Sequence, residues 1–63
     1  MKTLTYIIEA SADFDLAYNL ITEKIPCFAT WKPFGDDGEY IEVCFTCRQE
    51  DAAFVEEMLA PFV

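Results

Sequence analysis

The amino-acid sequence predicts a single small α+β domain covering residues 1–63, with the element order β-α-β-β-α. Two observations lead to this fold class. The apolar residues follow a period of two in some segments and a helical period in others. A chain of 63 residues, 54% of them hydrophobic, has room for one core and no second domain. We therefore expect a three-stranded antiparallel sheet with both helices packed on one face, as in half of a ferredoxin-like unit.

Residues 3–9 predict the first strand because alternate positions are apolar, namely Leu4, Tyr6 and Ile8. Ser11 is a residue type that caps helices, and two acids follow it where the helix dipole favours anions, Asp13 and Asp15. The expected helix then carries an apolar stripe of Phe14, Ala17, Tyr18, Ile21 and Ile25, widened by Leu16 and Leu20. Pro26 ends this helix, because a proline inside it would remove a hydrogen bond and clash with the preceding turn.

The next two strands are expected to form a hairpin. Residues 27–34 contain Pro33, which suits an edge strand, whereas residues 39–47 are continuous β formers and belong in the middle of the sheet. The expected connection is a three-residue loop whose last residue is left-handed, Asp36-Asp37-Gly38. This register places Trp31 opposite Val43, Ala29 opposite Phe45 and Cys27 opposite Cys47.

The last helix is expected to open with a capping box made by Thr46 and Gln49. Its inward residues recur at helical spacing and are Ala52, Val55, Leu59 and Phe62, with Phe54 and Met58 at the margin. Pro61 breaks the helix at its C-terminal end.

Two helices can cover only one face of the sheet, and strand alternation assigns each side chain to a face. The covered face is expected to hold Leu4, Tyr6, Ile8, Ala29, Trp31, Ile41, Val43 and Phe45. The uncovered face is expected to hold Thr5, Ile7, Phe28, Thr30, Lys32, Phe34, Tyr40, Glu42, Cys44 and Thr46. A register shifted by one residue would exchange the two faces.

The composition argues against several classes of function. Histidine is absent, and the glycines form neither a GxGxxG nor a GxxxxGK motif, so we expect no enzyme, no cofactor and no metal. Twelve acids against four Lys and Arg give a net charge of −8, which opposes direct nucleic-acid binding. No long apolar run occurs, and Glu9 and Asp13 interrupt any signal-peptide core. We therefore expect a cytoplasmic protein that does not enter a membrane.

Three cysteines leave one further chemistry open. Cys44 and Cys47 form a CxxC segment, as in thiol oxidoreductases, and with Cys27 they supply three of the four ligands of a structural zinc. Cys44 is expected within a strand, however, on the opposite face from Cys47. Reduced, partly buried thiols are the main expectation, with redox or zinc function as a third alternative. In an oxidising environment, Cys27 and Cys47 are the pair expected to bridge.

The acidic residues fall into three clusters along the chain, which are Asp13 with Asp15, residues 36–39 and residues 50–57. A solvated face is the ordinary explanation for such clusters. The functional hypothesis is that their field attracts a basic protein and that their carboxylates imitate a phosphate backbone. In that hypothesis the partner-binding residues are Asp36, Asp37, Glu39, Glu42, Glu50, Asp51, Glu56 and Glu57, with the aromatic anchors Phe34 and Tyr40.

In size and charge, the chain resembles the small acidic inhibitors carried by phages and mobile elements, including anti-CRISPR and anti-restriction proteins. The resemblance implies a non-enzymatic module that blocks a basic, nucleic-acid-binding protein, and it carries over no residue role. The alternative class is a self-associating structural or regulatory domain. Its homodimer would form through an open edge strand or through the apolar side chains of the uncovered face, which are Ile7, Phe28, Phe34 and Tyr40.

Overall fold

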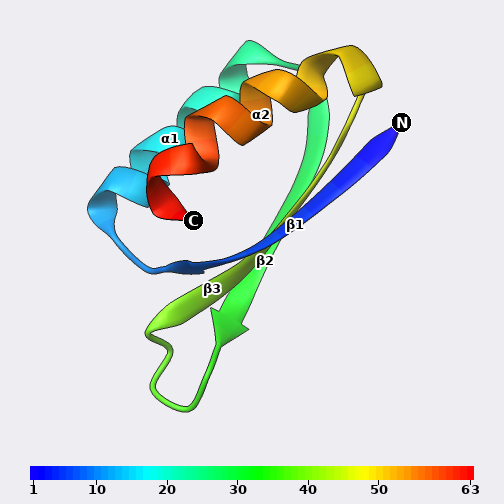
Figure 1. Cartoon of the computed structure of the whole chain (residues 1–63). Coiled ribbons are helices and arrows are strands. Elements are labelled where there is room, and N and C mark those ends of the chain that lie inside the picture. Colours follow the sequence, from blue (N-terminus) through cyan, green and yellow to red (C-terminus); the bar gives the residue numbers. More distant parts are fainter.

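The computed structural model describes residues 1–63 and confirms the α+β fold class. The elements are β1 (Lys2–Glu9), α1 (Ala12–Lys24), β2 (Cys27–Phe34), β3 (Tyr40–Cys47), a 3-10 turn (Gln49–Asp51), α2 (Ala52–Leu59) and a closing 3-10 turn (Ala60–Phe62). The three strands form one sheet in the order β1-β3-β2, with both pairs antiparallel. Both helices lie on the same side of this sheet (Figure 1). No helix combines the length and the apolar character needed to cross a membrane.

The register of the β2–β3 hairpin is the predicted one, since Trp31 pairs with Val43 and Cys27 with Cys47. Hydrogen bonds of an antiparallel strand alternate between its two sides. Ala10 donates its N–H to the carbonyl oxygen of Glu39 at 2.8 Å, so the even-numbered residues of β1 bond to β3. By the same alternation the odd-numbered residues of β2 face the free edge. The backbone nitrogen of Pro33 therefore faces away from β3, so its lack of an N–H removes no hydrogen bond from the sheet.

The loop of this hairpin is longer than predicted. Strand pairing stops at Phe34 and Tyr40, and the loop covers the five residues 35–39. Gly38 has the expected positive φ of 69°, but Gly35 also has a positive φ, of 93°. The prediction of a three-residue loop was wrong because Gly35 turns the chain before a further pair forms. The strand pairing is still the predicted one, because the loop is longer by one residue on each side.

Helix α1 begins as the sequence predicts. The Oγ atom of Ser11 accepts a hydrogen bond from the backbone N–H of Phe14 at 3.1 Å, and the helix ends before Pro26. Its buried side chains are Phe14, Ala17 and Ile21. Leu16 and Leu20 were expected to widen this stripe, but they are 63% and 44% exposed. They lie off the stripe because the short helix needs only one narrow face to cover the sheet.

The start of α2 differs from the prediction. Thr46 belongs to β3, where its hydroxyl lies 3.3 Å from that of Thr3 on the neighbouring strand, so it does not cap a helix. The helical segment opens instead with the 3-10 turn at Gln49, which has no side-chain cap. The capping box was wrong because the strand continues one residue beyond Thr46. Of the expected inward residues, Ala52, Val55 and Leu59 are buried on α2, whereas Phe62 lies beyond the helix in the closing 3-10 turn and is only partly buried.

The core lies between the helices and β3, and Trp31 falls outside it. Ten buried residues form one cluster, which are Ile8, Phe14, Ile21, Ile41, Val43, Phe45, Cys47, Ala52, Val55 and Leu59. Trp31 occupies the helix side of the sheet, as predicted, yet it is 58% exposed. The hairpin of β2 and β3 extends beyond the helical layer (Figure 1), so the outer part of the edge strand has no helix above it.

Candidate functional site

The acids predicted to bind a partner do not form one patch. Asp36, Asp37 and Glu39 lie in the loop that precedes β3, whereas Glu50 and Asp51 lie in the turn that follows it. From Tyr40 to Cys47, β3 spans about 23 Å at 3.3 Å per residue. The acids of the loop and those of the turn therefore lie at opposite ends of the sheet, while Glu42 lies on β3 and Glu56 and Glu57 lie on α2.

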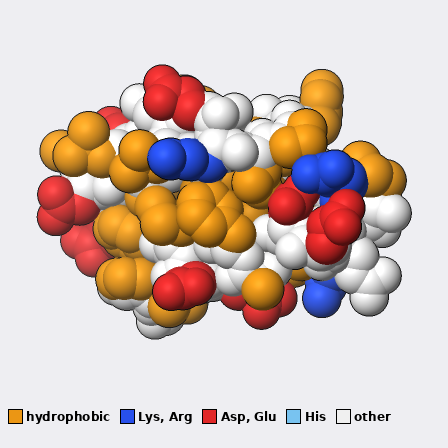
Figure 2. Space-filling view, turned by 90° about the horizontal axis from the view of Figure 1, so that it is seen from above, with side chains coloured by type: hydrophobic (Ala, Val, Ile, Leu, Met, Phe, Trp, Pro, Cys, Tyr) orange, Lys and Arg blue, Asp and Glu red, His pale blue; other side chains and the backbone are white.

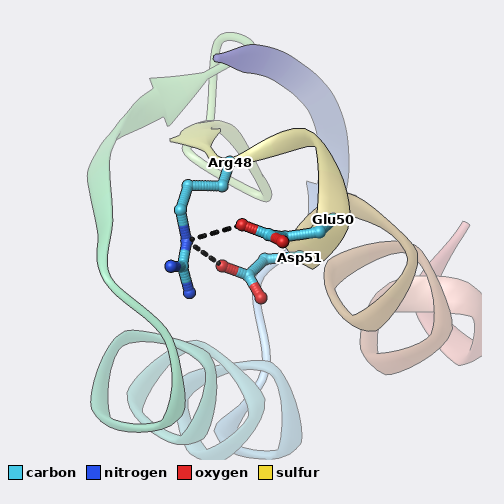
Figure 3. A network of polar contacts seen from close by, with 3 residues as sticks. All are labelled: Arg48, Glu50 and Asp51. Atoms are coloured by element: carbon cyan, nitrogen blue, oxygen red, sulfur yellow. Dashed lines mark hydrogen bonds and ion pairs between the residues drawn. The ribbon is translucent and has the colours of Figure 1, made fainter.

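At the far end of β3, the acids already have cationic neighbours. The Nε atom of Arg48 lies 2.9 Å from the Oδ2 atom of Asp51 and 3.4 Å from the Oε1 atom of Glu50 (Figure 3). The hydrogen bond to Asp51, followed by the charges of Asp51 and Glu50, raises the pKa of Arg48. Such exposed pairs add little stability, but they offset the local negative charge.

Two further predicted acids are paired in the same way. Lys2 lies 3.9 Å from Glu56, and Lys32 lies 3.3 Å from Glu42 across the β2–β3 pair. Three of the four Lys and Arg are thus engaged with predicted site residues. The acids with an ion pair are Glu42, Glu50, Asp51 and Glu56, and those without one are Asp36, Asp37, Glu39 and Glu57.

The hairpin end of the sheet gathers more acids than the loop acids predicted from the sequence. Glu9 lies opposite Tyr40 in the register of β1 and β3, and the Ala10–Glu39 hydrogen bond ties the end of β1 to the hairpin loop. Helix α1 starts directly afterwards and adds two carboxylates in its first turn. We call this group the acidic end, defined as Glu9, Asp13, Asp15, Asp36, Asp37 and Glu39.

None of the six carboxylates of the acidic end forms an ion pair. Figure 2 shows the helix side of the molecule, with acidic side chains at its left end, a Lys or Arg side chain left of centre, and cationic and acidic side chains together at its right. The sequence predicted Asp13 and Asp15 as one of three acidic clusters but not as partner-binding residues, and it did not predict Glu9 as part of any cluster. The expected pairing of the first strand with the third could have predicted that Glu9 and the start of the first helix lie beside the hairpin loop.

The aromatic anchors lie beside the acidic end. Phe34 and Tyr40 are direct partners on the uncovered face, and each is 43% exposed. Ile7 lies diagonally from Tyr40 on β1 and is half exposed. Phe28 is 71% exposed, but it lies about 20 Å along β2 from Phe34. The proposed dimer face is therefore an apolar group of three residues and one separate phenylalanine, with the Lys32–Glu42 pair between them.

A groove of about 270 Å³ opens on the helix side of the sheet, between α1 and the hairpin. Its lining residues are Phe14, Asp15, Tyr18, Asn19, Trp31 and Ile41. Burial, followed by the nearby Cys27, raises the pKa of Tyr18. A second hollow, of about 360 Å³, is lined in part by Glu9 and Asp13. Both hollows thus border the acidic end.

The three thiols do not converge. Cys44 points to the uncovered face, where its Sγ atom accepts a hydrogen bond from the Thr5 hydroxyl at 3.7 Å. Cys47 is buried on the helix side, opposite Cys27. Burial, followed by the charges of Cys47 and Asp51, raises the pKa of Cys27. No three His, Cys, Asp or Glu side chains are arranged to hold a metal ion.

Fold and surface together define a small α+β domain with one strongly acidic end and a neighbouring aromatic groove. Comparisons with protein-family models, with curated protein sequences and with solved structures find no match to this chain.

Proposed function

We propose that this protein is a non-enzymatic protein-binding module whose acidic end docks on a basic, nucleic-acid-binding surface of another protein. The observation that carries the proposal is the gathering of six unpaired carboxylates from three different elements at one end of the molecule. A field of one sign attracts Lys and Arg side chains and raises the association rate. The carboxylates of the acidic end resemble the phosphates of nucleic acid in that both present a series of fixed negative charges to a basic protein surface.

The fold supports this role by holding the carboxylates in place. Glu9 ends a paired strand, Asp13 and Asp15 stand in the first turn of α1, and the loop acids are held between paired strands. Phe34 and Tyr40 supply apolar area beside them, and aromatic residues dominate the energies of many protein interfaces. In the complex, the acidic end would occupy the groove of the partner and exclude its nucleic acid, as the resemblance to phage and mobile-element inhibitors implies.

The test uses two double variants of equal charge. The bait is captured from a lysate of the native host, the captured basic protein is purified, and its affinity for the bait is measured over a salt series. We expect Asp36→Asn with Asp37→Asn to weaken binding by about tenfold or more and to reduce its salt dependence. Glu56 and Glu57 lie on α2, and the double variant Glu56→Gln with Glu57→Gln is expected to change the affinity by less than about twofold. Equal effects of the two double variants would contradict the proposal.

A second candidate is self-association through the uncovered sheet face. The specific observation is the exposure of Phe34, Tyr40 and Ile7 side by side, on a face that no helix covers. Sedimentation over a range of concentrations would show a dimer, and Tyr40→Glu is expected to make it monomeric. A wild-type monomer at millimolar concentration would exclude this candidate and leave the first one untouched.

A further inference from the structure

Trp31, the only tryptophan of the chain, is unusually exposed for a residue on the helix side of the sheet. It lies on the helix side of the sheet, where the sequence predicts burial, but the helices stop short of it and leave it 58% exposed. Its ring forms one wall of the groove of about 270 Å³, and the buried Phe14 and Ile41 contribute to the lining. A large aromatic surface is thereby held open to solvent by a rigid strand.

The charge around this groove has one sign. Asp15 is the only charged residue among the six that line it, and its carboxylate forms no ion pair. Tyr18 adds a third aromatic ring to those of Trp31 and Phe14, and its centroid lies 5.6 Å from that of Phe45 and 6.1 Å from that of Phe14. Aromatic faces attract cations through the ring quadrupole, and a neighbouring carboxylate adds a charge-assisted hydrogen bond.

The size of the groove restricts the occupant. Pockets for small ligands and cofactors measure about 300–1,000 Å³ and bury most of the ligand. This groove is smaller than that range and borders the exposed Trp31, so it suits one side chain of a macromolecule. An apolar side chain would leave the Asp15 carboxylate without a partner and partly desolvated, which is unfavourable. A planar guanidinium can stack on an indole and hydrogen-bond a carboxylate at the same time, whereas an ammonium cannot stack.

We propose that the groove between Trp31, Tyr18 and Asp15 binds an arginine side chain of the basic partner. The guanidinium stacks on Trp31 and pairs with Asp15, and the aliphatic part of the side chain lies against Tyr18. This inference rests on the proposed function and adds to it a specific contact. The acidic end supplies the long-range attraction, and the groove selects a surface with a projecting arginine.

The test uses Trp31 as its own reporter, because no other tryptophan contributes to the fluorescence. The probes are three blocked tripeptides, Gly-Arg-Gly, Gly-Lys-Gly and Gly-citrulline-Gly, the last of which is neutral and nearly isosteric with arginine. Titration is followed by fluorescence and by the NMR shift of the indole N–H. We expect saturable binding of the arginine peptide at millimolar concentration, weaker binding of the lysine peptide and none of the citrulline peptide. Equal responses to the arginine and citrulline peptides would overturn the proposal.

Variants separate the groove from the general acidic field. Asp15→Asn is expected to weaken arginine-peptide binding by about fivefold or more. Glu23→Gln removes the same charge from α1 outside both the groove and the acidic end, and it is expected to change arginine-peptide binding by less than about twofold. Trp31→Leu, read through the Tyr18 ring resonances, is expected to abolish the response, and thermal unfolding of each variant confirms that it folds. Unchanged binding by Asp15→Asn would overturn the assignment.

The two proposals can fail separately. Capture of a basic partner that is weakened by the Asp36 and Asp37 substitutions but unaffected by Asp15→Asn and Trp31→Leu would support the acidic end and exclude the groove. Arginine-peptide binding without any salt-dependent capture of a protein would overturn the proposed function while leaving the groove as an isolated cation site.

Discussion

Glu9 lies directly opposite Tyr40, although 31 positions separate them along the chain. This pairing joins the end of β1 to the start of the hairpin loop and so brings the acids of β1, α1 and the loop to one end of the sheet. Meanwhile Lys2, Lys24 and Arg48 remain at the opposite end, where β1 begins and α1 and β3 end. Charge polarity is thus a consequence of strand topology.

The cap of α1 is a sensitive point for stability. Ser11→Ala removes the hydrogen bond that the Phe14 N–H donates to the Ser11 side chain. We expect a loss of about 1 kcal/mol in the free energy of unfolding, because a donor at the helix start loses its partner. Thermal unfolding should show a fall of about 4–8 °C in Tm for a domain of this size. Ser11→Asp, which retains a capping oxygen, is the control, and an equal loss in both variants would contradict the capping role.

Two leucines allow the helical faces to be compared. Leu59 is fully buried on α2, whereas Leu16 is mostly exposed on α1. Leu59→Ala is expected to cost about 2–5 kcal/mol, which is comparable with the total stability of a small domain. Leu16→Ala is expected to change the free energy of unfolding by less than about 0.5 kcal/mol. Urea unfolding measures both, and a large effect at Leu16 would mean that another surface covers it.

Much of the fold could be predicted from local signals. Alternation located the three strands, Ser11 and Pro26 bounded α1, and Pro33 excluded β2 from the middle of the sheet. These signals act within a few residues, and each one restricts the backbone directly. The hairpin register was predicted from a three-residue loop, and it is confirmed although the loop has five residues, because the loop is longer by one residue on each side.

The candidate site was harder to predict because it depends on how elements lie over one another. Trp31 has the periodicity of a covered residue, and only the extent of the helical layer decides its exposure. Likewise, Glu42 and Glu56 look like free acids in the sequence until the fold places them beside Lys32 and Lys2. Hydrophobic periodicity reports which face a residue occupies, but it does not report the reach of a helix or the partner of a surface charge.

Alkaline pH is expected to destabilise the protein. Burial raises the pKa of Tyr6, Tyr18 and Cys27, with added effects of Glu56 on Tyr6, of Cys27 on Tyr18, and of Cys47 and Asp51 on Cys27. The folded state therefore holds these protons more tightly than the unfolded state. Their contribution to stability is present at neutral pH and is lost as the pH rises above about 9. The urea concentration at the midpoint of unfolding should decrease as the pH is raised from 9 to 11.

Phenylalanine variants identify the groups responsible for this pH dependence. Tyr6→Phe and Tyr18→Phe remove the ionisable hydroxyl, and each should reduce the decrease in the urea midpoint at alkaline pH. Tyr40→Phe is the control, since Tyr40 lies on the exposed face of the hairpin. A urea midpoint that stays constant up to pH 11 in the wild-type protein would contradict the expectation.

The position of the cysteines predicts which disulfide can form. Cys27 and Cys47 are cross-strand partners at a pair that does not exchange backbone hydrogen bonds, where the Cα atoms of antiparallel strands lie about 4.5 Å apart. That separation is within the range of disulfides, whereas Cys44 and Cys47 point to opposite faces of β3. Because its pKa is raised, Cys27 reacts slowly at neutral pH and faster as the pH increases. Diamide at mildly alkaline pH should yield the Cys27–Cys47 bridge, identified by peptide mapping of the unreduced protein. Cys44→Ser should oxidise as the wild type does, and a bridge that contains Cys44 would show that β3 opens under these conditions.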